Sequence, residues 1–255
     1  MNVYDLLNIC YDIAPLDSVW SDDNVGLLID REGDVGRVLV ALDVSLEIIK
    51  EAAAIGAQVI ISHHPVIFSP LKSITYSSPY GRRVMALIKN NIACICLHTN
   101  YDGAEGGIND ELARLLGLTD VRVLVNSDGK YGRYGLLYAP QSLRAFAERV
   151  KHILKGTSVR AYDSGRPAHN VCVGSGRSGK IMDLAIKAGC DTLVTGDVSH
   201  DLLCEARDMG MNIIDAGHFA TEDIMCDMLI NELKKRNSEL DILKAANNIR
   251  PYTEV

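Results

Sequence analysis

The sequence predicts an α/β protein built from two related α/β domains, and two observations indicate this class. Apolar, β-branched runs alternate with segments of helical spacing, as they do in parallel sheets whose strands are joined by helices. The alternation also occurs twice, because a shift of 133 residues (171 minus 38) lays residues 38–64 on residues 171–197 without a gap, with six identities in 27 positions. An internal duplication explains both halves, and a length of 255 residues suits two domains.

In the first half, residues 37–64 are expected to form a strand, a helix and a second strand. RVLVALDV is β-branched and apolar, SLEIIKEAAAIG has helical spacing and ends in glycine, and AQVIISHHP is a short buried strand. Asp43 or Ser45 is expected to cap the helix. A helix through GRRVMALIKNN and the strand IACICLH follow, and the turn-rich segment TNYDGAEGGIND then leads to the helix ELARLLG.

The second half repeats this order. VCVGSGRSG predicts a strand and a loop, KIMDLAIKAG a helix, CDTLVTGD a strand, CEARDMG a helix and MNIIDAGH a strand. Glycine and polar residues cluster without apolar periodicity at residues 126–135, which predicts a domain boundary there. We therefore expect a first domain of residues 1–125 plus 215–255 and a second domain of residues 126–214.

The composition is that of an ordinary folded protein. Hydrophobic residues make up 47% and charged residues 23% of the chain, so neither disorder nor a membrane class is favoured. The net charge of −7 disfavours nucleic acid as a partner, although a basic cavity lining would not show in this sum. Seven cysteines without the spacing of a disulfide scaffold indicate reduced thiols. The first residues lack a signal-peptide pattern, and no apolar run reaches the ~20 residues of a membrane span, so we expect a cytoplasmic location.

Two neighbouring histidines stand where a buried strand ends. His63 and His64 come immediately before Pro65, which prevents the strand from continuing in a ladder. Adjacent strand residues point to opposite faces, but at a bending strand end both rings can reach one crevice. A histidine pair by itself is more often a polar strand end than a metal site, so the interpretation depends on other residues.

Two further strands are each followed by a histidine and, four residues later, an acid. IACICL precedes His98 and Asp102, and MNIIDAG precedes His218 and Glu222. If His218 begins a helix, residues four apart share a face, so His218 and Glu222 can bind together. All these residues follow the carboxyl ends of strands, where α/β proteins collect their ligands.

Imidazole and carboxylate groups without cysteine suit zinc, iron(II) or manganese. We therefore predict two divalent metal ions in the cleft between the domains, held by three histidines and two acids: His63, His64, Asp102, His218 and Glu222. Two metals that share one carboxylate account for five ligands more naturally than one metal does. Such a pair of ions lowers the pKa of a shared water and polarises the electrophile, which predicts a hydrolase.

Several long motifs resemble one known family. The runs DNVGLLID, VLVALDVSLEIIKEAAAIGAQVIISHHPVIF, HTNYDGAEGGINDELARLLGL, TGDVSH and NIIDAGHFATE are together similar to the NIF-three-like family, whose members are named GTP cyclohydrolase 1 type 2 homologs. The motifs lie in family order over nearly the whole chain. One departure is visible, because family members commonly have two histidines after the GDV motif, whereas His200 is followed here by Asp201. No role is therefore carried over to a second histidine.

The resemblance implies a two-domain α/β protomer, a dinuclear metal centre and a homohexameric ring with a central cavity. It carries metal binding onto the five residues named above and makes Glu222 the bridging carboxylate. The family name points to opening of the GTP ring. The chain corresponds to the short form of the family, because no segment between the halves is long enough for an additional domain.

Other residues have more than one interpretation. His98, Asp197 and His200 are candidates for the general acid, and His98 is alternatively expected to orient Asp102 or contact substrate. The GSGRSG loop at residues 174–179 follows a strand and opens a helix, so it predicts either a phosphate or dinucleotide site or a tight turn without ligand. Residues 22–24 form an ordinary turn or contribute to the cleft rim.

The sequence thus favours a metal-dependent hydrolase in which activated water attacks a nucleotide or phosphoester-like substrate. The alternative is a non-enzymatic, metal-binding hexameric ring that binds a protein or nucleic-acid partner, which a basic cavity lining would favour. A third interpretation, a nicotinamide-dependent enzyme that uses the GSGRSG loop, requires NAD binding.

Overall fold

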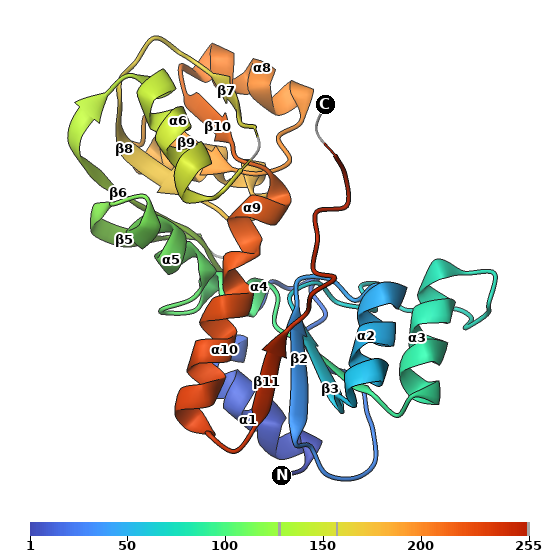
Figure 1. The fold of residues 1–255 in the computed structure, drawn as a ribbon. Helices are drawn as coiled ribbons and strands as arrows, with labels where there is room; N and C mark the ends of the chain where they lie inside the picture. Colours follow the sequence, from blue (N-terminus) through green and yellow to red (C-terminus); the bar gives the residue numbers. More distant parts are fainter. Residues whose placement is uncertain (127–128, 157, 254–255) are drawn as a thin grey trace. The chain divides into compact units, whose positions relative to one another are not determined.

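The computed structural model describes residues 1–126, 129–156 and 158–253, and the chain divides into two compact units. Unit 1 comprises Met1–Ala104 and Met225–Pro251, and unit 2 comprises Glu105–Ile224 and Tyr252–Val255. Each unit has its own sheet and its own helices (Figure 1). The predicted α/β class is therefore confirmed.

The sheet of unit 1 has, among the described residues, five strands in the order β1-β4-β3-β2-β11. Neighbouring strands are parallel except for β1, which pairs with β4 in the antiparallel direction. The strands are β1 (Gly26–Ile29), β2 (Arg37–Ala41), β3 (Val59–Ser62), β4 (Ala93–Cys96) and β11 (Asp241–Lys244). The helices are α1 (Val3–Ile13), α2 (Leu46–Ile55), α3 (Pro79–Lys89), α4 (Thr99–Gly103) and α10 (Ile224–Arg236), with a 3-10 turn at Leu16–Ser18.

The first strand, helix and strand predicted from the sequence are β2, α2 and β3. Ser45 caps α2, because its side-chain oxygen accepts a hydrogen bond from the backbone N–H of Ile48 at 3.2 Å. Strands β3 and β4 are buried along their whole length, as the apolar runs predict. His63 directly follows β3, and His98 lies two residues after β4. The buried sheet of unit 1 therefore determines the positions of these two histidines.

The sheet of unit 2 has six strands within the described ranges, in the order β5-β6-β8-β9-β10-β7. Strands β8, β9 and β10 are parallel, and the remaining pairs are antiparallel. The strands are β5 (Thr119–Asn126), β6 (Gly129–Gln141), β7 (Arg160–Tyr162), β8 (Ala168–Val173), β9 (Thr192–Thr195) and β10 (Asn212–Asp215). The helices are α5 (Ile108–Leu115), α6 (Leu143–Ile153), α7 (Met182–Lys187), α8 (His200–Met209) and α9 (His218–Glu222), with a 3-10 turn at Gly179–Ile181.

The two units share a run of three parallel strands joined by helices. The shift of 133 residues carries β3, Val59–Ser62, onto β9, Thr192–Thr195. The strands that follow, β4 and β10, both lead into a histidine and a short helix. This agreement follows the repeated pattern of the sequence, and its origin in an internal duplication stays a prediction.

The boundaries of the units differ from those of the predicted domains. Residues 126–135 were expected to separate the domains, but Asn126 pairs with Gly129 where β5 meets β6, so this segment joins two strands of one sheet. Residues 127–128 lie outside the described residues. Because β5 pairs with β6, the preceding helix α5 also belongs to unit 2, and the first boundary falls after Ala104. The glycine and polar cluster thus falls within unit 2 and not at the boundary between the units.

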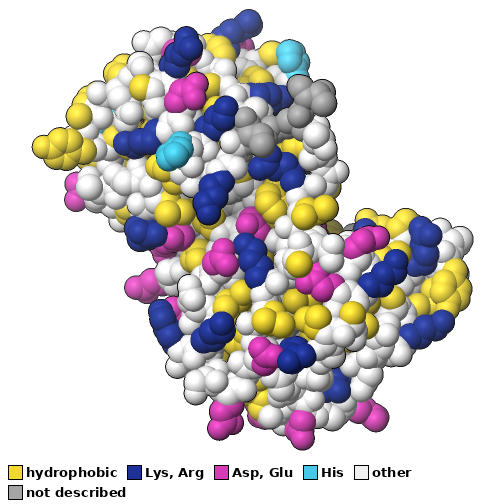
Figure 2. Space-filling model, in the orientation of Figure 1, with side chains coloured by type: hydrophobic (Ala, Val, Ile, Leu, Met, Phe, Trp, Pro, Cys, Tyr) yellow, Lys and Arg dark blue, Asp and Glu magenta, His cyan; other side chains and the backbone are white. Residues whose placement is uncertain are grey.

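Among the described residues, no helix is long and apolar enough to cross a membrane. On the face drawn in Figure 2, acidic and basic side chains are interspersed, and both signs occur together with hydrophobic side chains.

Candidate metal centre

Three histidine rings gather at the carboxyl ends of β3 and β4 in unit 1. The backbone N–H groups of His63 and His64 donate to the carbonyl oxygens of Ala41 and Leu42, so pairing with the β2 side continues through both histidines. The ring centroids of His63 and His64 lie 5.1 Å apart, and that of His98 lies 5.0 Å from His63 and 5.7 Å from His64. One ring nitrogen from each of the three lies within 4.8 Å of the other two, so this group could hold a metal ion.

Each of these rings is held at Nδ1 by an oxygen acceptor. Nδ1 of His63 lies 2.9 Å from the carbonyl oxygen of Leu97, the residue after β4. Nδ1 of His64 lies 2.9 Å from Oδ1 of Asp43, and Nδ1 of His98 lies 2.8 Å from Oδ1 of Asp23. An acceptor at Nδ1 keeps the proton on that nitrogen, so the lone pair of a neutral ring lies on Nε2, as in metal-binding histidines.

Asp102 belongs to the same group. It lies in α4, is buried, and its Oδ1 is 3.8 Å from Nε2 of His63. This distance is too long for a hydrogen bond. It suits two ligands of one ion, because metal–ligand bonds of roughly 2.1 Å leave such ligands about 3 to 4 Å apart. His98 was one of the residues expected to orient Asp102. Its Nδ1 instead forms a hydrogen bond with Asp23.

The Asp23 carboxylate is a buried part of this site. Its side chain is 3% exposed, and it accepts hydrogen bonds from Nδ1 of His98 and from the backbone N–H and hydroxyl of Thr99. Burial raises the pKa of Asp23, but the hydrogen bonds from His98 and Thr99 outweigh this effect and lower it to about 2. The sequence offered residues 22–24 only as a turn or a cleft rim, and Asp23 is instead the residue that orients His98.

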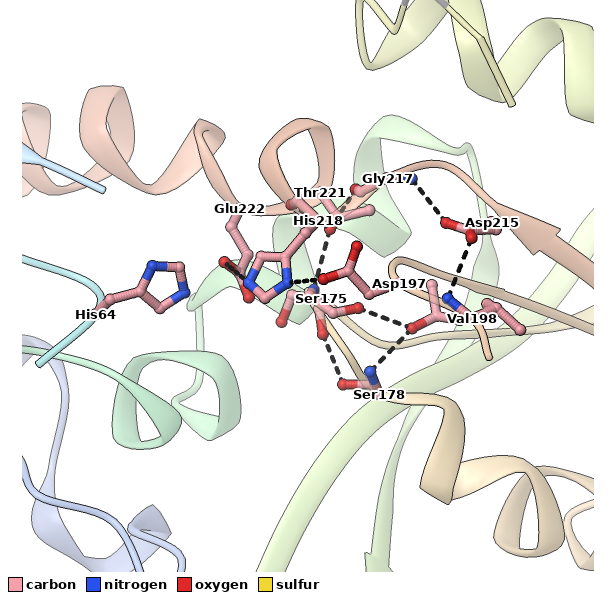
Figure 3. Close-up of polar contacts among 12 residues, drawn as sticks. His64, Ser175, Ser178, Asp197, Val198, Asp215, Gly217, His218, Thr221 and Glu222 are labelled. Atoms are coloured by element: carbon pink, nitrogen blue, oxygen red, sulfur yellow. Dashed lines mark hydrogen bonds and ion pairs between the residues drawn. The ribbon is translucent and has the colours of Figure 1, made fainter. Parts of the chain in front are cut away.

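The second group of predicted ligands lies in unit 2. His218 is the first residue of α9 and Glu222 the last, and Nε2 of His218 is 2.8 Å from Oε2 of Glu222 (Figure 3). The expectation that a helix brings these two side chains together is confirmed. Nδ1 of His218 is 2.8 Å from Oδ2 of Asp197, so Nδ1 of this fourth ring is held by an oxygen acceptor as in unit 1, whereas its Nε2 faces the Glu222 carboxylate.

Gly176 leaves room for the Glu222 side chain. A Cβ atom added to Gly176 would lie 1.9 Å from Oε1 of Glu222 and 3.2 Å from Nε2 of His218. Its backbone φ of +54° also favours glycine. Within unit 2, the position thus accepts only a residue without a side chain if Glu222 and His218 are to keep their places.

The backbone amides of the GSGRSG loop are used by the protein itself. The N–H of Ser175 donates to Asn109, that of Gly176 to the hydroxyl of Thr221, and that of Ser178 to the hydroxyl of Thr195. A phosphate or dinucleotide site needs such amides to point at the ligand. Of the two interpretations, the structure therefore favours the tight turn, which packs beside Glu222, and it provides no support for the nicotinamide-dependent enzyme.

The three candidates for the general acid have different surroundings. Asp197 accepts from His218, and His98 lies in the cluster of unit 1. His200 begins α8 as an exposed residue, and its Nε2 lies 3.5 Å from Sγ of Cys204, one helical turn further on. The contacts of His200 thus give it a partner outside the predicted ligand set.

The donor set fits a divalent metal ion. Its atoms are imidazole nitrogens and carboxylate oxygens, the mixture that suits zinc, iron(II) or manganese. Four rings have Nδ1 held by an acceptor, which orients Nε2 and raises its basicity. The fold and these groups define a class: a two-unit α/β protein with histidine and carboxylate clusters, able to hold metal, at the carboxyl ends of its strands.

Comparison with known proteins identifies the family within this class. The family model of Duf34/NIF3 (NGG1p interacting factor 3) matches residues 1–251, and the chain belongs to this family. A GTP cyclohydrolase 1 type 2 homolog of Clostridium acetobutylicum is 34% identical over 263 residues, which cover 99% of this chain and 98% of that protein. The resemblance drawn from the sequence motifs is thereby confirmed.

Solved structures agree with the fold. The crystal structure of a Bacillus cereus protein related to NIF3 is similar with a TM-score of 0.93 at 24% identity, and the match covers 100% of this chain and 99% of that one. A hypothetical protein of Staphylococcus aureus has a TM-score of 0.90 at 27% identity, with the same coverage. This chain therefore shares its fold with both of these proteins.

Proposed function

We propose that this protein is a dinuclear metal-dependent hydrolase whose substrate resembles a nucleotide or a phosphoester. The proposed ligands are His63, His64 and Asp102 from unit 1 with His218 and Glu222 from unit 2. The observation that carries the proposal is the shared arrangement of the three ligand histidines, because an oxygen acceptor at Nδ1 directs each Nε2 toward a ligand position. We propose in addition that the ligands of unit 1 and the ligands of unit 2 bind the same pair of ions.

When bound, two divalent ions supply Lewis acidity and an activated water for attack on the substrate. The protein's own residues hold the ligands in place. Asp43 and Asp197 accept hydrogen bonds from the Nδ1–H groups of His64 and His218, and the carbonyl oxygen of Leu97 accepts one from His63. The carboxylate of Glu222, buried beside Gly176, is the proposed bridge. Zinc, iron and manganese all accept this donor set.

Proton transfer to the leaving group is assigned to His98. Its Nδ1 proton is held by Asp23, so Nε2 is the atom that can take up and release a proton. The ring of His98 stands 5.0 Å from that of His63, next to the proposed ligands. Asp197 is then a positioning residue for His218, and His200, paired with Cys204, has no assigned step.

Metal analysis followed by a substrate screen tests the proposal. Protein purified without chelators should carry two divalent ions per chain, and anomalous scattering should find two peaks about 3.5 to 4 Å apart. His64→Ala and His218→Ala should each lower metal content, whereas His152→Ala, an exposed histidine on α6, should not. A screen of nucleotides and phosphoesters with the loaded protein should give turnover. Two retained ions in both ligand variants would contradict the ligand assignment.

The homohexameric ring implied by the resemblance stays a prediction, and light scattering coupled to size-exclusion chromatography measures it. If the ring is a scaffold without activity, metal should be present but no substrate of the screen should turn over. That result would favour the non-enzymatic alternative.

A further inference from the structure

A cavity of about 430 Å³ opens in unit 1 beside His64. The beginning of α2 lines it with Glu47 and Ile48, and α3 contributes Arg83. Another side is closed after β11 by Asn247, Asn248, Ile249 and Pro251. Asp43, which orients His64, also lines the cavity. The cavity therefore adjoins a proposed metal ligand, and its volume lies in the range of small-molecule sites.

Hydrogen bonds fix the wall after β11. The Glu51 carboxylate accepts from the backbone N–H of Ala246 at 2.6 Å, and from the backbone and side-chain N–H groups of Asn247 at 3.0 and 2.8 Å. The backbone N–H of Leu42 donates to Oδ1 of Asn248 at 2.8 Å. The cavity is thus bounded by a segment anchored to both α2 and the end of β2.

The lining combines apolar walls with a polar mouth. Val44, Ile48 and Val66 are buried beneath the cavity, and Ile249 lines it with 69% of its surface exposed. Covering an exposed isoleucine favours a ligand with an apolar face. A flat ring meets this requirement with little loss of conformational entropy on binding.

The charges of the mouth disfavour a phosphate. Asp43 and Glu47 contribute two carboxylates, whereas Arg83 contributes one guanidinium group. An anion at Arg83 would add like charge beside both carboxylates. Glu47 is exposed and already accepts a hydrogen bond from Ser45, and Arg83 stacks on the ring of Tyr80. A neutral ligand that accepts a hydrogen bond from Arg83 and donates one to Glu47 adds to these contacts without such repulsion.

We propose that this cavity binds an uncharged cyclic-amide ring, of the kind found in hydroxypyrimidine and hydroxypurine bases, as the recognition part of the substrate. The ring carbonyl accepts from Arg83, the neighbouring ring N–H donates to Glu47, and the flat faces rest against the apolar walls. This inference rests on the proposed function, because a ring held here leaves the rest of the substrate free to extend past His64.

Calorimetric titration of the metal-free protein with uridine, inosine and guanosine tests the inference apart from catalysis. At least one nucleoside should bind saturably. Arg83→Ala and Glu47→Ala should each weaken binding by tenfold or more, because each removes a hydrogen bond to a charged group. The matched control is Arg82→Ala, the exposed neighbour on α3 that does not line the cavity. Thermal unfolding should be the same for all variants.

The outcomes separate this inference from the proposed function. Failure of all three nucleosides to bind, or equal weakening by Arg82→Ala, overturns the inference while leaving metal binding and hydrolysis to their own tests. Binding of inorganic phosphate that is abolished in Arg83→Ala also overturns it, because the cavity is then an anion site. Nucleoside binding with the expected variants, but no turnover in the loaded protein, supports the cavity assignment and contradicts the hydrolase.

Discussion

Asp197 holds the ring of His218 with a carboxylate oxygen 2.8 Å from Nδ1, and it does so from a backbone φ of 50°. Few residues other than glycine adopt this left-handed conformation, although aspartate and asparagine tolerate it better than most. Asp197 lies two residues after the end of the buried strand β9. The direction of a proposed metal ligand therefore depends on a strained residue that is not itself a ligand.

The change Asp197→Asn should weaken metal binding by about 10- to 100-fold, because the acceptor that orients His218 loses its charge. Asparagine suits the same backbone conformation, so the fold should be unaffected. Metal titration measures the affinity, and an assay at saturating metal then measures the activity of the variant. If Asp197 only positions His218, activity should return once metal is bound. Activity that stays lost at full metal occupancy would instead make Asp197 the general acid.

The change Gly176→Ala should empty the His218 and Glu222 group, because the new Cβ would displace an oxygen of Glu222. The matched control is Gly210→Ala at the end of α8, where φ is +64° and no atom lies within 4 Å of the added Cβ. Both changes carry a backbone cost of about 1 kcal/mol at positive φ. Only Gly176→Ala should also lower metal content. Equal metal content in the two variants, at equal stability, would show that Glu222 tolerates displacement.

Asp23→Asn should destabilise the metal-free protein at neutral pH by about 2 kcal/mol, because the pKa of Asp23 lies well below its ordinary value in the folded state. The pKa of Asp23 in the folded protein is about 2, whereas its ordinary value is 3.8. Ionised Asp23 therefore stabilises the fold above pH 3.8, and the contribution is lost as pH falls from 3.8 toward 2. Urea unfolding of both proteins at pH 7, 4 and 3 should show the difference shrinking in acid. If the two proteins differ in unfolding free energy by the same amount at every pH, the charge of Asp23 contributes nothing to stability.

The sequence predicted best where one local rule decides the geometry. Four-residue spacing on a helix brought His218 and Glu222 together, and strand ends brought His63, His64 and His98 to one edge of the sheet. Such rules act over a few residues or one strand layer, so they can be applied without knowing the fold.

The residues that orient the rings were harder to predict. Asp23 lies 75 residues before His98, and Asp43 lies 21 residues before His64, so only the folded sheet brings each pair together. No spacing rule covers such distances. The GSGRSG loop shows the opposite problem, because its pattern of glycines suits a phosphate site, yet its amides donate to side chains at positions 109, 195 and 221. Local composition cannot reveal that competition.

Glu222→Gln separates catalysis from scaffolding. The change keeps the size of the side chain but removes the charge that a bridging carboxylate places between two cations. It should weaken or empty at least one metal position while the fold persists, since each unit has its own buried sheet. If the protein is a hydrolase, turnover should fall by orders of magnitude, because each ~1.36 kcal/mol of lost transition-state stabilisation is tenfold in rate.

The control for this change is Glu205→Gln, an exposed acid on α8 of the same unit, which should alter neither metal content nor turnover. Metal content, activity and size-exclusion profile should be measured on one preparation of each variant. Under the hydrolase mechanism, Glu222→Gln loses metal and activity together while its oligomer survives, because the sheets and helices form without the ions. If the metals only hold a scaffold together, oligomer or thermal stability should fall in step with metal, and any hydrolysis should continue at its original rate. Undiminished activity after loss of both metals would refute the mechanism.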